Sequence, residues 1–351
     1  MKRDRLLGLD LIRGLCAVAV MIYHYCHLAK WGDPYAMGTF GVYIFFVLSG
    51  FALYYVYGQK QVDEQFLRGF FVSRFLRIMP LFVAVAVYRM WGKPLDDYNF
   101  VRLLVHATPL IGIADVAAFS KVMVGGWSIL IEWSFYLLFP FMMLFWRMGS
   151  VVALFVLTMV INYNYVKAGY FPPAYMRTGE GLPYTDTLTF LCFFVGGMLA
   201  AKIYLEAADI MLRMQKVRRP LYWALGCVAL IFALPAFYPF EGRIDFLSGA
   251  DASLLVLLTI ALVFLAAMEQ PEGRLAKAST FLGDVSFAVY LLHVYVWNFV
   301  GKRLDPPDWL QFTISVPLTL FVSLLVYKYF ERPMRDIRKW WPRRYGGTYV
   351  P

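Results

Sequence analysis

Several long apolar segments of this sequence contain ionisable side chains. Arg13 and His24 lie eleven residues apart in LDLIRGLCAVAVMIYHY, and later segments contain Glu132, Asp284 and His293. An ionisable group within hydrocarbon costs about 2.5 to 3.5 kcal/mol or more, so such a residue usually faces the interior of a helix bundle and has a function. These five residues are therefore the first candidates for chemistry.

Three of the candidates are expected at a similar depth, in the outer half of the membrane: His24, Glu132 and His293. Histidine suits proton abstraction from an alcohol because its ordinary pKa lies near ~6.5. A carboxylate such as that of Glu132 can orient or charge-balance a histidine, as the second member of a catalytic relay does. We expect an acid/base centre at this level.

A second set, made of arginines, is expected near the inner surface. Arg13 lies about 16 Å along the helix axis from His24, and the segment SRFLRIMP, interpreted as a loop, adds Arg74 and Arg77 on one helical face. Arginine binds phosphate through two parallel hydrogen bonds. A phosphate-bearing carrier from the cytoplasm is expected to dock here, with its reactive end reaching toward His24.

Each of these residues also has a purely structural explanation. Arg13 can extend to the inner headgroups, and a lone histidine often serves as a hydrogen-bonding residue between helices. Arg74 and Arg77 also fit an ordinary positively charged inner loop.

Composition places the candidates in an all-α integral membrane protein. The 351 residues are 61% hydrophobic and 16% charged, with a mean hydropathy of +0.60, whereas soluble domains carry about 25% charged residues. Continuous apolar runs favour helices over a β-barrel. We expect one transmembrane domain over residues 1–351, with ten spans at 12–29, 39–57, 78–92, 127–146, 150–166, 186–203, 221–239, 252–268, 281–300 and 311–329.

The positions of the basic residues explain the net charge of +10. Lys and Arg cluster at residues 2–5, 60–77, 202–219 and 328–344, which the positive-inside rule assigns to the cytoplasmic side. Both termini, including a basic tail at 330–351, are therefore expected in the cytoplasm, and no nucleic-acid partner is indicated. Segments 93–126 and 167–185 are then expected on the outer side of the membrane, where the second can contact a substrate.

Metal and disulfide chemistry are not indicated. Cys16, Cys26, Cys192 and Cys227 fall within apolar spans, without the spacing of a zinc site or a disulfide framework. The sequence also has no GxSxG elbow, HExxH motif, Walker A loop or dinucleotide fingerprint.

Five segments in order resemble the membrane acyltransferase 3 family of bacterial integral membrane O-acyltransferases: LDLIRGLCAVAVMIYH, GVYIFFVLSGF, SRFLRIMPLF, GGWSILIEWSFYLLFP and VSFAVYLLHVYV. The resemblance covers the whole chain. The essential Arg and His of the family's first helix match Arg13 and His24, and its paired arginines match Arg74 and Arg77. Its remaining motifs fall on Trp127, Ser128, Glu132, Ser286, Tyr290 and His293.

The resemblance implies transfer of an acyl group, usually acetyl, from cytoplasmic acyl-coenzyme A to a sugar hydroxyl of a cell-envelope glycan, exopolysaccharide or lipid-linked precursor. It implies catalytic roles for His24, Glu132 and His293, carrier binding by Arg13, Arg74 and Arg77, and substrate contacts from Trp127, Ser128 and Tyr290. It also implies the bacterial inner membrane as location, with other polysaccharide assembly proteins as partners. The hydrolase-like domain that some members append is not expected here.

Two other classes remain open at this point. A transporter or flippase of a glycolipid or anion would use intramembrane Arg, His and Glu as a pathway without acyl transfer, although no internal repeat is visible. A non-catalytic scaffold in a polysaccharide assembly would leave the ionisable residues unexplained.

Overall fold

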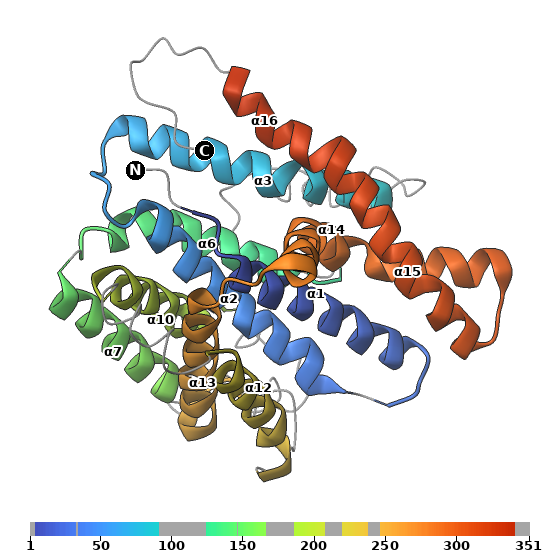
Figure 1. Ribbon diagram of the computed structural model, residues 1–351, viewed down its shortest axis with the longest axis horizontal. Helices are drawn as coiled ribbons and strands as arrows, with labels where there is room; N and C mark the ends of the chain where they lie inside the picture. Colours follow the sequence, from blue (N-terminus) through green and yellow to red (C-terminus); the bar gives the residue numbers. More distant parts are fainter. Residues whose placement is uncertain are drawn as a thin grey trace.

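The computed structural model describes residues 4–32, 34–90, 124–145, 147–165, 186–207, 220–237 and 246–340. Within these ranges the chain is helical and contains no β-strand, which confirms the predicted all-α class. The helices, arranged as Figure 1 shows, are α1 (Leu7–Leu28), α2 (Tyr35–Tyr57), α3 (Glu64–Met90), α6 (Gly126–Met142), α7 (Met148–Tyr165), α10 (Thr187–Glu206), α12 (Pro220–Phe237), α13 (Gly249–Met268), α14 (Gly273–Leu304), α15 (Asp308–Val326), the π-helix η2 (Tyr327–Glu331) and α16 (Arg332–Trp340).

Helix length and composition make the chain a multi-pass membrane protein. Among the described residues, seven helical segments are long and apolar enough to cross a membrane: α1, α2, α3, α10, α13, α14 and the segment Asp308–Ile337. Helices α6, α7 and α12 are also apolar but shorter. Every predicted span overlaps one of these helices, while ten crossings and the cytoplasmic placement of both termini stay predictions.

Helix α3 differs most from its predicted span. It begins at Glu64, well before the expected start at 78, so Arg74 and Arg77 lie inside a helix and the prediction of a loop is wrong. A hydropathy pattern detects only the apolar part of a helix. The first turns of α3 are polar, and backbone hydrogen bonds and side-chain pairs such as Glu64 with Arg68 stabilise them. The expected tail likewise begins as helix, since η2 and α16 continue α15 to Trp340.

Some predicted segments lie outside the described residues. They are 93–123 of the first external segment, all of 167–185, most of the basic cluster at 202–219, and 341–351 of the tail.

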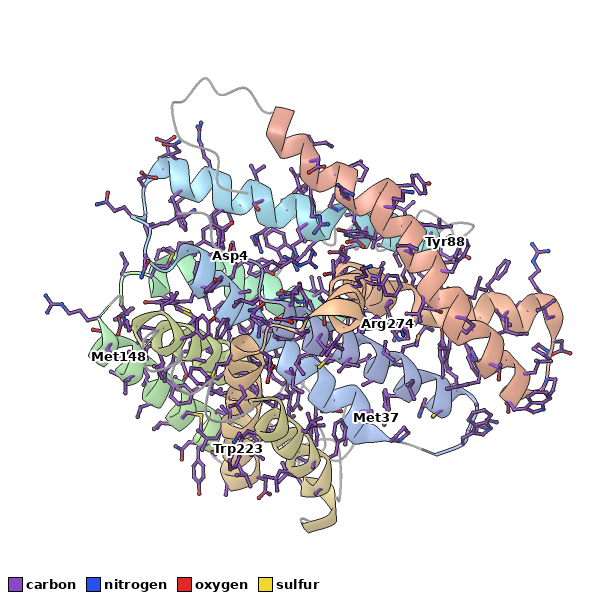
Figure 2. All side chains as sticks on the ribbon, in the orientation of Figure 1. Asp4, Met37, Tyr88, Met148, Trp223 and Arg274 are labelled. Carbon is purple, nitrogen blue, oxygen red and sulfur yellow. The ribbon has the colours of Figure 1, made fainter. Side chains whose placement is uncertain are left out.

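The core forms around α2 and α10. These two helices are the most enclosed of the candidate spans, and they approach closely because glycines face each other. A Cβ at Gly50 would collide with the carbonyl oxygen of Phe194, and a Cβ at Gly197 with that of Val47. Small residues at such crossings let helix backbones pack at short range in membranes. Side chains fill the space between the helices (Figure 2).

Helices α1 and α14 form a second close pair, and this pair positions the candidate site. A Cβ at Gly14 of α1 would collide with Leu282 of α14. Further along, the hydroxyl of Tyr25 donates to the carbonyl of His293 at 2.9 Å and lies 2.7 Å from the hydroxyl oxygen of Thr319 on α15. Helix α16 then packs against α3, as Figure 1 shows.

Candidate active site

A cavity lies between α1, α2, α3, α6 and α14. It holds about 780 Å³ of space not filled by atoms, part of it open to solvent. Its polar lining residues are Arg13, Ser49, Arg74, Arg77, Ser128, Glu132, Tyr136, Ser286 and Tyr290. Residues from five helices thus meet in one cavity, where the arginines lie with Glu132, Ser128 and Tyr290.

Arg74 and Arg77 come to this cavity from α3, where their spacing of three residues places them on one face as predicted. The guanidinium carbon of Arg74 lies 5.9 Å from the ring centres of both Tyr57 and Tyr136. The electron-rich faces of aromatic rings attract a cation at this distance. Within the described part of the chain, Nε of Arg74 is buried without a hydrogen-bond partner. This donor is therefore available to a ligand.

Glu132 supplies the negative charge on the cavity wall. Its carboxylate accepts hydrogen bonds from the hydroxyl of Ser49 at 2.9 Å and from the hydroxyl of Tyr136, one turn further along α6. It also interacts through its charge with Arg74. The sequence led us to expect Glu132 beside a histidine, but these contacts place it among the arginines and hydroxyl groups.

Ser128 and Tyr290 meet at another part of the cavity wall. Their hydroxyl oxygens lie 2.6 Å apart, and both donate to the carbonyl of Gly125, at 2.9 and 3.3 Å respectively. Gly125 has a φ of 75° just before α6, a left-handed conformation that glycine adopts without strain. Trp127 does not line the cavity and packs against Phe46 and Phe190.

His24 and His293 form a pair next to this region. Their ring centres are 4.9 Å apart, and His293 is 1% exposed. Nδ1 of His24 lies 2.9 Å from the carbonyl oxygen of Val20, and Nδ1 of His293 lies 3.0 Å from that of Val289. Because a carbonyl oxygen only accepts, each Nδ1 carries a hydrogen, and Nε2 is the basic nitrogen of either ring when that ring is neutral.

The histidine pair lies beside the cavity and is not part of its described lining. Tyr290 provides the connection, because it lines the cavity while its ring centre is 6.4 Å from that of His293. Phe45, also in the lining, lies 5.8 Å from Tyr290. Tyr290 therefore belongs to the cavity wall and also lies next to His293.

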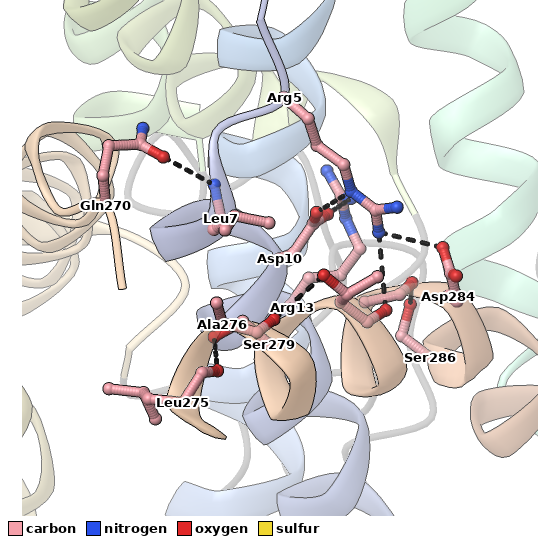
Figure 3. Close-up of polar contacts among 12 residues, drawn as sticks. Arg5, Leu7, Asp10, Arg13, Gln270, Leu275, Ala276, Ser279, Asp284 and Ser286 are labelled. Atoms are coloured by element: carbon pink, nitrogen blue, oxygen red, sulfur yellow. Dashed lines mark hydrogen bonds and ion pairs between the residues drawn. The ribbon is translucent and has the colours of Figure 1, made fainter. Parts of the chain in front are cut away.

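Sequence reasoning named Asp284 but missed Asp10 and Arg5, which join it to Arg13 in one group of charged residues (Figure 3). Nη1 of Arg13 donates to Oδ1 of Asp10 at 3.0 Å, and the other carboxylate oxygen of Asp10 accepts from Nε of Arg5. Arg5 also donates to Asp284 of α14 at 2.8 Å. The spacing of Asp10 three residues before Arg13, within an apolar helix, was the signal available in the sequence.

The carboxylates also change the electrostatics of Arg5. Burial lowers the pKa of its guanidinium, but the hydrogen bonds and negative charges of Asp10 and Asp284 outweigh burial and raise the pKa above its ordinary value. Arg5 therefore stays charged beside both carboxylates.

The four cysteines are free, and Cys16 and Cys192 are buried. In the part of the chain that the structure describes, no group of three His, Cys, Asp or Glu side chains is arranged to hold a metal ion.

This chain is similar to known proteins over nearly its whole length. A family model described as an acyltransferase domain matches residues 6–328. The exopolysaccharide production protein ExoZ of Rhizobium meliloti (strain 1021) is 28% identical, over 90% of this chain and 94% of that protein. Nodulation protein 10 of Rhizobium leguminosarum bv. viciae is 23% identical, over 94% and 93%.

The peptidoglycan O-acetyltransferase OatA of Listeria monocytogenes is also 23% identical, over 93% of this chain but only 55% of that protein. No solved structure matches. With the family model spanning the cavity residues on all five helices, the chain belongs to the acyltransferase 3 family of membrane acyltransferases.

Proposed function

We propose that the protein is an O-acyltransferase that moves an acetyl group from acetyl-coenzyme A to a sugar hydroxyl of an envelope glycan, an exopolysaccharide or a lipid-linked precursor. The observation that carries this proposal is the cavity in which three arginines converge beside the histidine pair. The names of two relatives, an exopolysaccharide production protein and a peptidoglycan O-acetyltransferase, support a glycan as the acceptor.

The arginines favour a phosphate-bearing donor. Coenzyme A carries phosphates at one end and its thioester at the end of a long flexible arm. Arg13, Arg74 and Arg77 present several N–H donors to one cavity, and guanidinium groups match phosphate geometry. The arm would then run past Tyr290 toward His24, which lies about 16 Å from Arg13 along the axis of α1.

The reaction needs a base and an acceptor at the histidine pair. His24 takes the proton of the sugar hydroxyl on Nε2, the hydroxyl oxygen attacks the thioester carbon, and a C–O bond forms as the C–S bond breaks. The coenzyme A thiolate leaves and takes up a proton. His293, whose ring lies beside that of His24, keeps this region polar enough for His24 to become charged. Trp127, Ser128 and Tyr290 would shape the acceptor side.

Glu132 completes the proposed catalytic set from the cavity wall. Its negative charge interacts with Arg74 and reduces the excess positive charge of the cavity. A site with less excess positive charge releases the coenzyme A product more readily after transfer.

The direction of transfer follows from charge bias. With the basic clusters on the cytoplasmic side, the arginine end of the cavity faces the cytoplasm and the histidine pair lies toward the outer leaflet. This arrangement fits a bacterial inner-membrane enzyme that works beside other polysaccharide assembly proteins.

The test is acetyl transfer by purified protein in lipid nanodiscs. Radiolabelled acetyl-coenzyme A is offered with candidate glycans, and mass spectrometry of surface glycans from cells with and without the protein identifies the acceptor. We expect His24→Ala to abolish transfer, whereas His27→Ala, which changes an exposed histidine on the same helix, should leave it intact. Transfer by the His24→Ala protein at the wild-type rate would contradict the proposed mechanism.

A further inference from the structure

Asp10 is a buried carboxylate to which the proposed reaction gives no role. Its side chain is 8% exposed, and its two oxygens face different arginines, Arg13 and Arg5 (Figure 3). Arg13 lines the cavity, while Arg5 lies outside it and is anchored to Asp284 and to the carbonyl of Thr280 on α14. Asp10 therefore connects a cavity arginine to a neighbouring helix.

The packing of α14 holds the Asp10 carboxylate in place. A Cβ at Gly283 would lie only 2.6 Å from the Cβ of Asp10, so the two helices nearly touch at this point. With α14 on one side and Arg5 bound to its second oxygen, Asp10 has little room to move. The guanidinium of Arg13 is therefore bound to a fixed partner.

Charge and geometry predict opposite effects of Asp10 on the affinity of the cavity for an anionic ligand. Asp10 and Asp284 together offset the charges of Arg5 and Arg13, so by charge alone Asp10 weakens the attraction of the cavity for an anion. By geometry, Asp10 strengthens binding, because a free arginine side chain loses conformational entropy when a ligand orders it. An Arg13 already held by Asp10 loses less.

We propose that Asp10 is a positioning residue that holds the Arg13 guanidinium in the orientation that receives the phosphates of the acyl donor. This inference rests on the proposed function, since it takes coenzyme A as the ligand of Arg13. Asp10 uses one N–H group of Arg13 and leaves the other donors of the fork for the ligand. The donor site is thus assembled before the donor arrives, and binding is correspondingly stronger.

The experiment measures the affinity of a non-hydrolysable acetyl-coenzyme A analogue by calorimetry in nanodiscs. Asp10→Asn keeps the shape of the side chain and removes its charge. We expect its affinity for the analogue to fall about tenfold, as for the loss of one charge-assisted hydrogen bond. The kcat at saturating donor should change less than the affinity does. An unchanged or tighter affinity would overturn the proposal and leave Asp10 as a charge-compensating residue.

Asp284→Asn is the matched control. It removes the other carboxylate bound to Arg5 and does not contact Arg13 through any described hydrogen bond. We expect a loss of thermal stability similar to that of Asp10→Asn, with donor affinity within about twofold of wild type. An equal loss of donor affinity in both variants would show that the effect comes from helix packing and would overturn the positioning role.

Arg13→Gln separates failure of this inference from failure of the proposed function. If Arg13→Gln binds the analogue as wild type does, Arg13 is not a donor-binding residue and that part of the proposed function fails. If Arg13→Gln weakens binding, we expect Asp10→Asn to add nothing further in that background. An additional loss in the double variant would mean that Asp10 does not act through Arg13, and the inference alone would fail.

Discussion

The hydroxyl oxygens of Ser128 and Tyr290 lie 2.6 Å apart and join α6 to α14 at the wall of the cavity. Both groups also donate to the carbonyl of Gly125, so three groups from two segments form one small cluster. This cluster holds the Tyr290 ring, which lines the cavity and has its centre 6.4 Å from that of His293.

Removing one hydroxyl from this cluster should slow acyl transfer without weakening donor binding. Tyr290→Phe keeps the ring and loses the hydrogen bonds, which are worth about 1 kcal/mol each, so we expect kcat to fall roughly fivefold. Ser128→Ala should have a similar effect, and the double variant should be little worse than either. Steady-state kinetics with acetyl-coenzyme A measures all three; additive losses would show that the hydroxyls act independently.

Glu132→Gln should separate catalysis from donor binding. The amide keeps an oxygen that accepts from Ser49 and Tyr136, but the negative charge beside Arg74 is lost. Because that charge opposes an anionic donor, we expect donor affinity to stay equal or rise, while kcat falls at least about tenfold. Weaker donor binding by this variant would contradict an anion site at the arginines.

Arg74→Lys tests whether arginine geometry matters beyond charge. Lysine keeps the positive charge but loses the planar fork and the contact with the rings of Tyr57 and Tyr136. We expect donor affinity to fall about tenfold, in the range of one charge-assisted hydrogen bond. Arg68→Lys, on an exposed turn of the same helix, is the control and should bind the donor as wild type does. Equal affinities for all three proteins would rule out paired hydrogen bonding by Arg74.

Gly50→Ala tests the crossing of α2 and α10. The added Cβ would collide with the backbone oxygen of Phe194, and a backbone atom in a packed core cannot move aside cheaply. We expect a loss of several kcal/mol, seen as a lower unfolding midpoint in detergent. Gly69→Ala is the control, because nothing lies within 4 Å of a Cβ there. Alanine in that helix should raise stability by about 0.5 to 1 kcal/mol.

The sequence by itself determined the helical membrane class, the approximate positions of the helices that overlap the predicted spans, and the residues worth examining. Each of these depends on local pattern. An apolar run long enough to cross a bilayer is visible without any partner, and the three-residue spacing of Arg74 and Arg77 fixes their shared face. The same logic failed at the first turns of α3, because hydropathy does not detect a helix with a polar face.

Only the tertiary structure decided which of these residues meet. The bond from Arg5 to Asp284, the contact of Ser128 with Tyr290 and the pairing of His24 with His293 all join residues far apart in the chain. The first and third of these contacts depend on glycines such as Gly14 and Gly283, which let α1 and α14 approach closely. Such contacts depend on how helix faces pack against one another, and a local pattern carries no information about its distant partner.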